Sequence, residues 1–308
     1  MAKRALVAAV NDYSTWNSGV TIGSMTLSAP DLRWCLADSN DFSQLLKDSF
    51  LFDEVTVLQD AQATSQGIVN GINNLLSKSQ AGDVVCFYFS GHGGRLPETP
   101  GDASTRYYEA IVPYDANLVA SSQIAKMADG LQPDFTNFTI VLDSCNSGGM
   151  YLSPDSRAIV WDSASAQAFR NSCSAIVPWI CLPDPSPLDN NVSNLQLPDK
   201  GVCTMSVDVS KDSPNNAKAT LLSACDYGEE SEEDPGTDLG HGFFTKAIID
   251  AVNACNFQIS HTDLLTTLRK TVSGYVSTYS TPPQTPQLRG RPVRLEENFL
   301  AGWNYSVQ

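Results

Sequence analysis

The sequence predicts an α/β fold in which a central, mostly parallel β-sheet is flanked by helices. Short apolar runs rich in β-branched and aromatic residues alternate with amphipathic stretches, which is the pattern of strands joined by helical crossovers. One run, DVVCFYF at residues 83–89, is apolar almost throughout, as expected of a strand covered on both faces. With 308 residues, 42% of them hydrophobic, the chain can also bury a sizeable core.

Each expected element rests on its own pattern. The expected strands are the apolar, β-rich runs at residues 5–10, 55–58, 83–89, 138–142 and 219–223. The expected helices have apolar residues three and four positions apart, at residues 31–49, 64–78, 243–253 and 263–272. Thr64 is the expected N-cap of the helix at 64–78, because its hydroxyl can accept a hydrogen bond from an amide of the first turn.

We expect a single domain over residues 1–308 that is built from two halves. Residues 1–152 and 217–308 contain the predicted strands and helices. Residues 153–216 between them are rich in Pro, Ser, Asn and Asp, so we interpret them as a linker or excursion within one fold. A second polar segment, residues 227–239, carries a run of acids and is expected to be a surface loop.

The formal net charge of −15 argues against nucleic acid as a partner, because phosphates require clusters of Lys and Arg. The acidity suits a cationic substrate, although it also serves solubility alone. No stretch approaches the ~20 apolar residues of a membrane span. The apolar run at residues 5–10 is short for a signal peptide and ends in Asn11 and Asp12, so a cytoplasmic location is expected.

The eight cysteines show no framework spacing, and several lie in apolar runs, as Cys86 and Cys225 do. Reduced thiols are therefore expected. There is no CxxC pair and the chain has three histidines, so no structural zinc site is expected.

Two glycine-rich turns follow predicted strands and carry a histidine and a cysteine. SGHGG at residues 90–94 follows one strand, and DSCNSGG at residues 143–149 follows another. Reactive residues of parallel sheets gather at the carboxyl ends of the strands, so we expect His92 and Cys145 to lie close together. A thiol nucleophile needs a base and donors for the oxyanion, and the imidazole and amides such as that of Gly93 supply both. The pair predicts a cysteine peptidase.

His241 is the competing candidate for the base. It lies between two glycines, but it precedes a predicted helix and does not follow a strand. His261, at the start of the last long helix, is a weaker candidate.

The two motifs, in this order after two strands, resemble the caspase-like fold of metacaspases. Further segments of the chain are similar to that family in the same order: ALVAAVNDY (5–13), LRWCLADSND (32–41), EAIVPYD (109–115), LSACD (222–226), GFFTKA (242–247) and QTPQL (284–288). The resemblance leaves the linker and the C-terminal tail uncovered. It implies a type I-like catalytic unit, with no long prodomain before the first strand, and a monomer.

Specificity follows from the residues and from the resemblance. Asp143 lies two residues before the nucleophile, where a carboxylate would pair with an Arg or Lys side chain at the substrate's P1 position. The resemblance implies an S1 pocket formed by Asp38, Asp143 and Ser90, with Cys35 lining it. Protein substrates with Arg or Lys at P1 are therefore expected.

Calcium is the point where the chain departs from the family. Many metacaspases bind Ca²⁺ through aspartates near the active site, whereas the matching positions here are Tyr108, Ser121, Ser122 and Leu152. The resemblance therefore implies a Ca²⁺-independent enzyme without a metal cofactor. Another calcium site stays open at Asp102, Asp155 or residues 229–234.

The polar linker offers basic residues for self-cleavage as an activation step: Arg157, Arg170, Lys200 and Lys211. Two other functions stay open at this point. One is a legumain-like cysteine endopeptidase that cleaves after Asn, and the other is an inactive caspase-like scaffold that binds partners.

Overall fold

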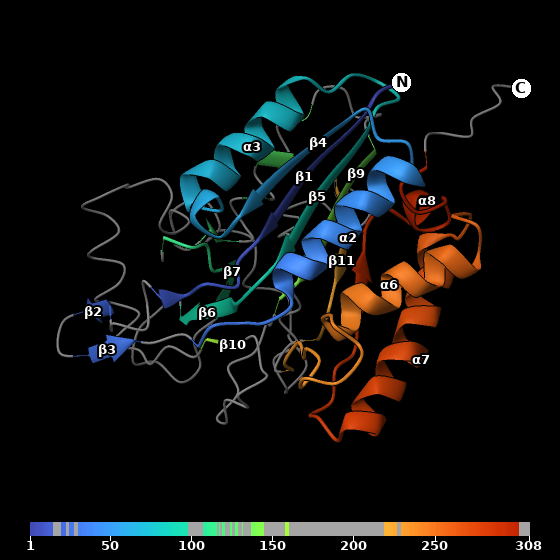
Figure 1. Ribbon diagram of the computed structural model, residues 1–308. Helices are drawn as coiled ribbons and strands as arrows, with labels where there is room; N and C mark the ends of the chain where they lie inside the picture. The colour runs from blue at the N-terminus through green and yellow to red at the C-terminus, as the bar shows by residue number, and fades with distance from the viewer. Residues whose placement is uncertain are drawn as a thin grey trace, which may run out of the picture.

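A six-stranded sheet forms the centre of the protein, in the order β12-β11-β9-β5-β1-β4 (Figure 1). Its strands are β1 (Lys3–Ala9), β4 (Glu54–Gln59), β5 (Val84–Ser90), β9 (Asn137–Asp143), β11 (Ala219–Ser223) and β12 (Gln287–Arg289). All neighbours pair in parallel except β12, which is antiparallel to β11. The computed structural model describes residues 1–14, 20–22, 25–27, 30–97, 107–115, 117, 119–120, 124, 127–128, 131, 137–144, 158–159, 219–226 and 229–301.

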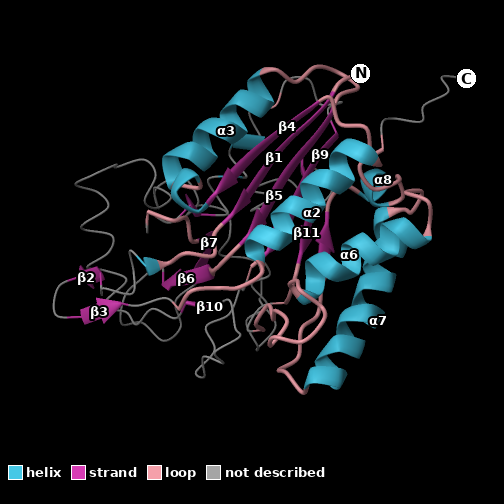
Figure 2. Ribbon diagram, viewed as in Figure 1, coloured by secondary structure: helices cyan, strands magenta, loops and turns pink. Residues whose placement is uncertain are grey.

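Helices cover both faces of this sheet (Figure 2). Helix α3 (Ser65–Ser77) lies on one face, and α2 (Cys35–Asp48), α6 (Phe243–Ala254) and α7 (His261–Tyr279) lie on the other. Alternate strand residues enter the two core layers: Leu6 and Phe87 face one layer, while Ala5 and Tyr88 face the other. This explains why β5 is apolar along its whole length, with all seven residues buried.

The predicted fold class and strands are confirmed, with each strand end within two residues of its expected position. Two helices differ from their predicted bounds by more than two residues. Helix α2 begins at Cys35, four residues later than expected, and α7 continues to Tyr279 before Ser280 ends it in the left-handed conformation. Thr64 caps α3 as predicted, since its hydroxyl accepts from the amide of Gly67 at 3.1 Å.

A smaller sheet extends from the carboxyl end of β5 in the order β10-β6-β7-β8 (Figure 1). Its strands are β6 (Gly93–Pro97), β7 (Tyr107–Ile111), β8 (Val119–Ala120) and β10 (Ala158–Ile159). Strand β6 begins directly after His92, so the turn that carries this residue is fixed between the two sheets. The other described elements are β2 (Val20–Ile22), β3 (Met25–Leu27), the 3₁₀ turn Asp60–Gln62 and α8 (Pro292–Leu295).

None of the helices in the described part of the chain is both long and apolar enough to cross a membrane. Cys86 and Cys255 form no disulfide bond within the described part of the chain. Cys86 lies in the core, where burial raises the pKa of its thiol, and Cys255 is exposed at the end of α6.

Candidate active site

The two predicted reactive turns begin at neighbouring strand ends. Strands β5 and β9 pair in parallel with Ser90 opposite Asp143, and the amide of Gly91 donates to the carbonyl of Asp143 at 3.2 Å. This register places His92, two residues after Ser90, beside the start of the turn that carries Cys145. Cys145 itself lies outside the described residues, and Ser144 is the last described residue before it.

His92 is completely buried, and its ring is held in one orientation. The Nε2 atom lies 2.8 Å from the carbonyl oxygen of Pro30. Because a carbonyl can only accept, Nε2 carries a proton, and a neutral ring then keeps its lone pair on Nδ1. This is the tautomer that a general base requires.

Tyr13 fixes the backbone of the histidine turn. Its hydroxyl accepts from the amide of His92 at 2.8 Å and donates to the carbonyl of Val112 at 3.0 Å, while its ring lies 4.5 Å from the imidazole. A Cβ at Gly91 would lie 2.8 Å from both the Tyr13 hydroxyl and the Phe89 ring, so this turn requires glycine. In the sequence, Tyr13 ends a segment similar to the family, but no local pattern indicates that its hydroxyl holds the histidine turn.

We expect Tyr13→Phe to lower kcat about tenfold and to leave KM nearly unchanged. The phenylalanine keeps the ring contact but leaves the buried amide of His92 and the carbonyl of Val112 without the hydroxyl, a loss of about 1–3 kcal/mol that loosens the imidazole. Steady-state kinetics on a peptide substrate separate the effect on kcat from the effect on KM. Tyr275→Phe is the matched control, because its hydroxyl only reaches the exposed Asp250 at 3.4 Å. A rise in KM with unchanged kcat would contradict this role.

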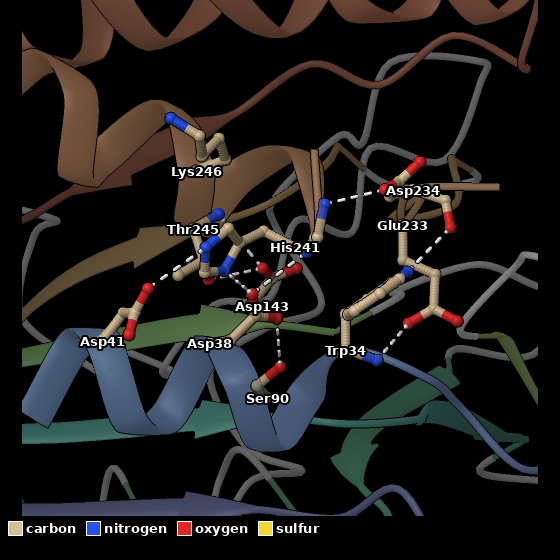
Figure 3. Close-up of polar contacts among 12 residues, drawn as sticks. Trp34, Asp38, Asp41, Ser90, Asp143, Glu233, Asp234, His241, Thr245 and Lys246 are labelled. Atoms are coloured by element: carbon tan, nitrogen blue, oxygen red, sulfur yellow. Dashed lines mark hydrogen bonds and ion pairs between the residues drawn. The ribbon is translucent and has the colours of Figure 1, made fainter. Parts of the chain in front are cut away.

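Three of the residues predicted for the S1 pocket lie on α2 and β5, and Figure 3 shows two of them, Asp38 and Ser90, in contact. Asp38 is fully buried on α2, and its Oδ2 accepts from the hydroxyl of Ser90 at 3.0 Å. Its Oδ1 accepts from the amide of Gly242 at 3.0 Å. Cys35, also buried, lies one turn before Asp38 at the start of the same helix.

Asp143, the fourth residue, is also fully buried at the end of β9. Its Oδ1 accepts from the hydroxyl of Ser231 at 2.7 Å, and its Oδ2 accepts from the amide and hydroxyl of Thr245 at 3.1 and 2.6 Å. Ser90 connects the two carboxylates, because it bonds to Asp38 and is the register partner of Asp143. Nothing in the sequence marks Ser231 and Thr245 as site residues, because only the folded chain brings them into contact with Asp143.

His241, the competing candidate for the base, contacts two carboxylates of α2. Its Nδ1 is 3.0 Å from Oδ1 of Asp38, and its Nε2 is 3.3 Å from Oδ2 of Asp41 (Figure 3). Burial favours the neutral ring, but the hydrogen bond and charge of Asp38, with the charge of Asp41, outweigh it and raise the pKa of His241 against the opposing charge of Lys246. This histidine therefore belongs to the carboxylate cluster.

His261 has a structural role at the start of α7. Its Nδ1 donates to the carbonyl of Glu297 at 3.0 Å, and its ring packs edge-on against Phe299. Burial lowers its pKa to about 4, so it is neutral across the physiological range.

The expectation that residues 227–239 form a surface loop is wrong for the acidic run. Residues 230–234 are at most 5% exposed. The carboxylate of Glu233 accepts from the amides of Arg33 and Trp34 at 3.0 and 3.3 Å, and the indole of Trp34 donates to the carbonyl of Asp234 at 2.9 Å. A carboxylate is stabilised near a helix N-terminus, and Glu233 holds the two residues that lead into α2. Composition alone cannot distinguish such a buried acid from a solvated one.

Asp234 closes the turn that leads to His241. Its carboxylate accepts from the amides of Gly236, Thr237 and Gly240 and from the hydroxyl of Thr237. Burial opposes its ionised form, but these hydrogen bonds prevail and hold the pKa of Asp234 below its usual range. The turn thereby presents His241 to α2.

The remaining predicted site residues are only partly placed. Gly93 is the first residue of β6, directly after His92. The linker residues proposed for self-cleavage lie outside the described residues: Arg157, Arg170, Lys200 and Lys211. Tyr108 lies on β7, whereas Ser121, Ser122 and Leu152 also lie outside. Within the described ranges, no group of three or more His, Cys, Asp or Glu side chains is arranged to hold a metal ion.

Comparisons with known proteins show the family to which the chain belongs. The family described as "Caspase domain" matches residues 2–294. Among curated proteins, Metacaspase-7 of Arabidopsis thaliana is 31% identical over 180 residues, which cover 56% of this chain and 41% of that protein. Metacaspase-4 of the same plant is 36% identical over 128 residues, 39% of this chain and 30% of that protein. The chain thus matches less than half the length of these relatives.

A solved structure resembles the fold over nearly the whole chain. The crystal structure of protein GSU0716 from Geobacter sulfurreducens superposes with a TM-score of 0.65, covering 99% of this chain and 100% of that one at 17% identity. At this level of identity, the likeness supports the fold alone.

Proposed function

Since the chain belongs to the caspase-domain family of cysteine peptidases, we propose that it cleaves peptide bonds after Arg or Lys through a dyad of His92 and Cys145. The observation that carries this proposal is the arrangement at the ends of β5 and β9. There a buried imidazole with its proton on Nε2 follows Ser90 by two residues, and two buried carboxylates, Asp38 and Asp143, lie at the same strand ends.

In the proposed mechanism, Nδ1 of His92 takes the proton of the Cys145 thiol. The thiolate attacks the scissile carbonyl, and amides near Gly93 and Cys145 hold the oxyanion. The imidazolium then protonates the leaving amine, and an acyl-enzyme remains. Water, deprotonated by His92, attacks the thioester and restores the thiol as the acid product leaves. Hydrogen bonding of Nε2 to Pro30 keeps the ring oriented throughout.

The carboxylates of Asp38 and Asp143 account for the proposed preference for Arg or Lys at P1. Asp38 and Asp143 are both fully buried, so their negative charges are weakly screened by solvent. A guanidinium or ammonium group of the substrate would pair with this charge. A P1 Asn would place a neutral amide between two acids, and a P1 Asp would add a third negative charge, so both are disfavoured.

Labelling with a peptidyl-Arg electrophile tests the proposed nucleophile. We expect a single adduct on Cys145, located by mass spectrometry, and none in His92→Gln at the same reagent concentration. The exposed Cys255 serves as an internal control for non-specific alkylation. An unmodified Cys145 in folded wild-type protein would favour an inactive scaffold, and labelling by a peptidyl-Asn reagent in its place would favour a legumain-like enzyme.

Self-cleavage in the linker is part of the proposal. Cutting after one of its basic residues would separate residues 1–152 from 217–308, whose strands share one sheet and would stay together. Wild-type protein should yield defined fragments during storage or incubation, and Cys145→Ala should stay intact. Identical fragments from both proteins would show that another protease cuts the linker.

We further propose that activity does not require Ca²⁺, because non-acidic residues stand at the four positions where many metacaspases carry calcium-binding aspartates. The proposed working unit is a monomer that acts on protein substrates. A reducing compartment such as the cytoplasm is the proposed location, because it suits a thiol nucleophile.

A further inference from the structure

His241 bridges two carboxylates on one face of α2. Nδ1 lies 3.0 Å from Asp38 and Nε2 lies 3.3 Å from Asp41, one helical turn further along (Figure 3). The side chains of His241 and Asp38 are 12% and 0% exposed, whereas that of Asp41 is 60% exposed. The ring therefore meets Asp38 in the interior and Asp41 at the surface.

Both contacts favour the protonated ring. Nδ1 is hydrogen-bonded to the carboxylate of Asp38, and Nε2 lies within ion-pair distance of Asp41, so a positive charge on the ring is stabilised from both sides. The charged groups that face the ring are Asp38 and Asp41 from α2 and Lys246 from α6, the helix that follows His241. Burial lowers the pKa of His241, but the hydrogen bond and charge of Asp38 and the charge of Asp41 outweigh it, so the pKa is raised.

Asp143, the other carboxylate of the predicted pocket, accepts from the hydroxyls of Ser231 and Thr245 and from the amide of Thr245. These three donors are neutral at every pH of interest. Asp38 has a titratable partner, so its attraction for a second cation depends on the charge of His241.

We propose that His241 sets the charge that Asp38 presents to the substrate, and so weakens the binding of a P1 Arg or Lys under acidic conditions. The inference rests on the proposed function, because it assigns Asp38 to the S1 pocket. His241 is a positioning and specificity residue, since it acts through Asp38.

Linkage fixes the sign of the effect. The pKa of His241 lies above its ordinary value of 6.5, so the ring is charged at pH 6 and loses its proton as the pH rises through that raised value. A cation bound at Asp38 and a proton on His241 disfavour each other reciprocally. The KM for a P1-Arg peptide should therefore fall as the pH rises through the pKa of His241.

The test is the KM of a P1-Arg peptide from pH 5.5 to 9 in wild type and His241→Asn. Asparagine can keep a neutral donor near Asp38 without the charge. We expect its KM at pH 6 to be roughly threefold to tenfold lower than that of wild type, and the two values to converge at high pH. The ratio of the two KM values at each pH removes the contribution of the catalytic dyad, because the dyad titrates in both proteins. His261→Asn, which removes a buried histidine elsewhere, should give a ratio independent of pH.

Asp41→Asn provides a second variant that keeps His241 itself. Removing this exposed carboxylate lowers the pKa of the ring, so the fall in KM should move to lower pH. A KM ratio for His241→Asn that is constant with pH would overturn the inference, and if that variant does not fold, an unmoved KM profile in Asp41→Asn would overturn it. If wild type cleaves no Arg or Lys peptide at any pH, the proposed function fails, and the inference fails with it.

Discussion

Replacing His92 with glutamine is expected to lower kcat for a P1-Arg peptide by about a thousandfold to ten-thousandfold. Glutamine can place its amide nitrogen near the position of Nε2 and so keep the hydrogen bond to the carbonyl of Pro30. It offers no base at the position of Nδ1. The thiol of Cys145 would then stay protonated at neutral pH, and the leaving amine would lack a proton donor.

The matched control is His261→Gln. Both histidines are buried, but His261 packs against Phe299 and carries no role in the proposed reaction. This variant should keep kcat at temperatures where it is folded, which circular dichroism establishes. Equal losses in the two variants would mean that His92 supports the fold and not the chemistry.

Replacing Asp143 with asparagine is expected to lower kcat/KM for Arg and Lys peptides by about a hundredfold to a thousandfold, the cost of leaving a buried cation without its partner. The exchange is nearly isosteric. The new amide nitrogen can donate to Ser231, whose hydroxyl then turns to accept, and the remaining oxygen still accepts from Thr245. The loss therefore reports the missing charge.

Asp83→Asn is the control for this change. Asp83 is also a buried aspartate, just before β5, at the opposite end of the sheet from Ser90, where it accepts from the amide of Ala2 and from Arg4. We expect it to lower the thermal midpoint without altering the preference among P1 residues. Unchanged cleavage after Arg in folded Asp143→Asn would remove this residue from the S1 pocket.

Much of the fold follows from local patterns in the sequence. The strands were predictable because burial on both faces makes runs such as residues 84–89 apolar throughout. Parallel strand order then places the ends of β5 and β9 together, and with them His92 and Asp143. The S1 residues on α2 came from the family resemblance, and the structure brings Asp38 to Ser90.

The rest depends on contacts between residues distant in the chain. The two residues before α2 are held by Glu233, about 200 residues away, and no local signal marks the start of the helix at Cys35. The same contacts bury an acidic run that composition assigns to the surface. His241 and Tyr13 gained their roles in the same way, through partners that only the folded chain brings near.

Hydrolysis of matched Arg, Lys, Asp and Asn reporter peptides by wild type and Cys145→Ala tests the central claim most directly. With calcium or with a chelator, wild type should cleave the Arg and Lys peptides at equal rates in the two conditions and leave the Asp and Asn peptides intact, while Cys145→Ala cleaves none. Hydrolysis that survives in Cys145→Ala, or cleavage after Asp or Asn in place of the basic residues, would contradict the account.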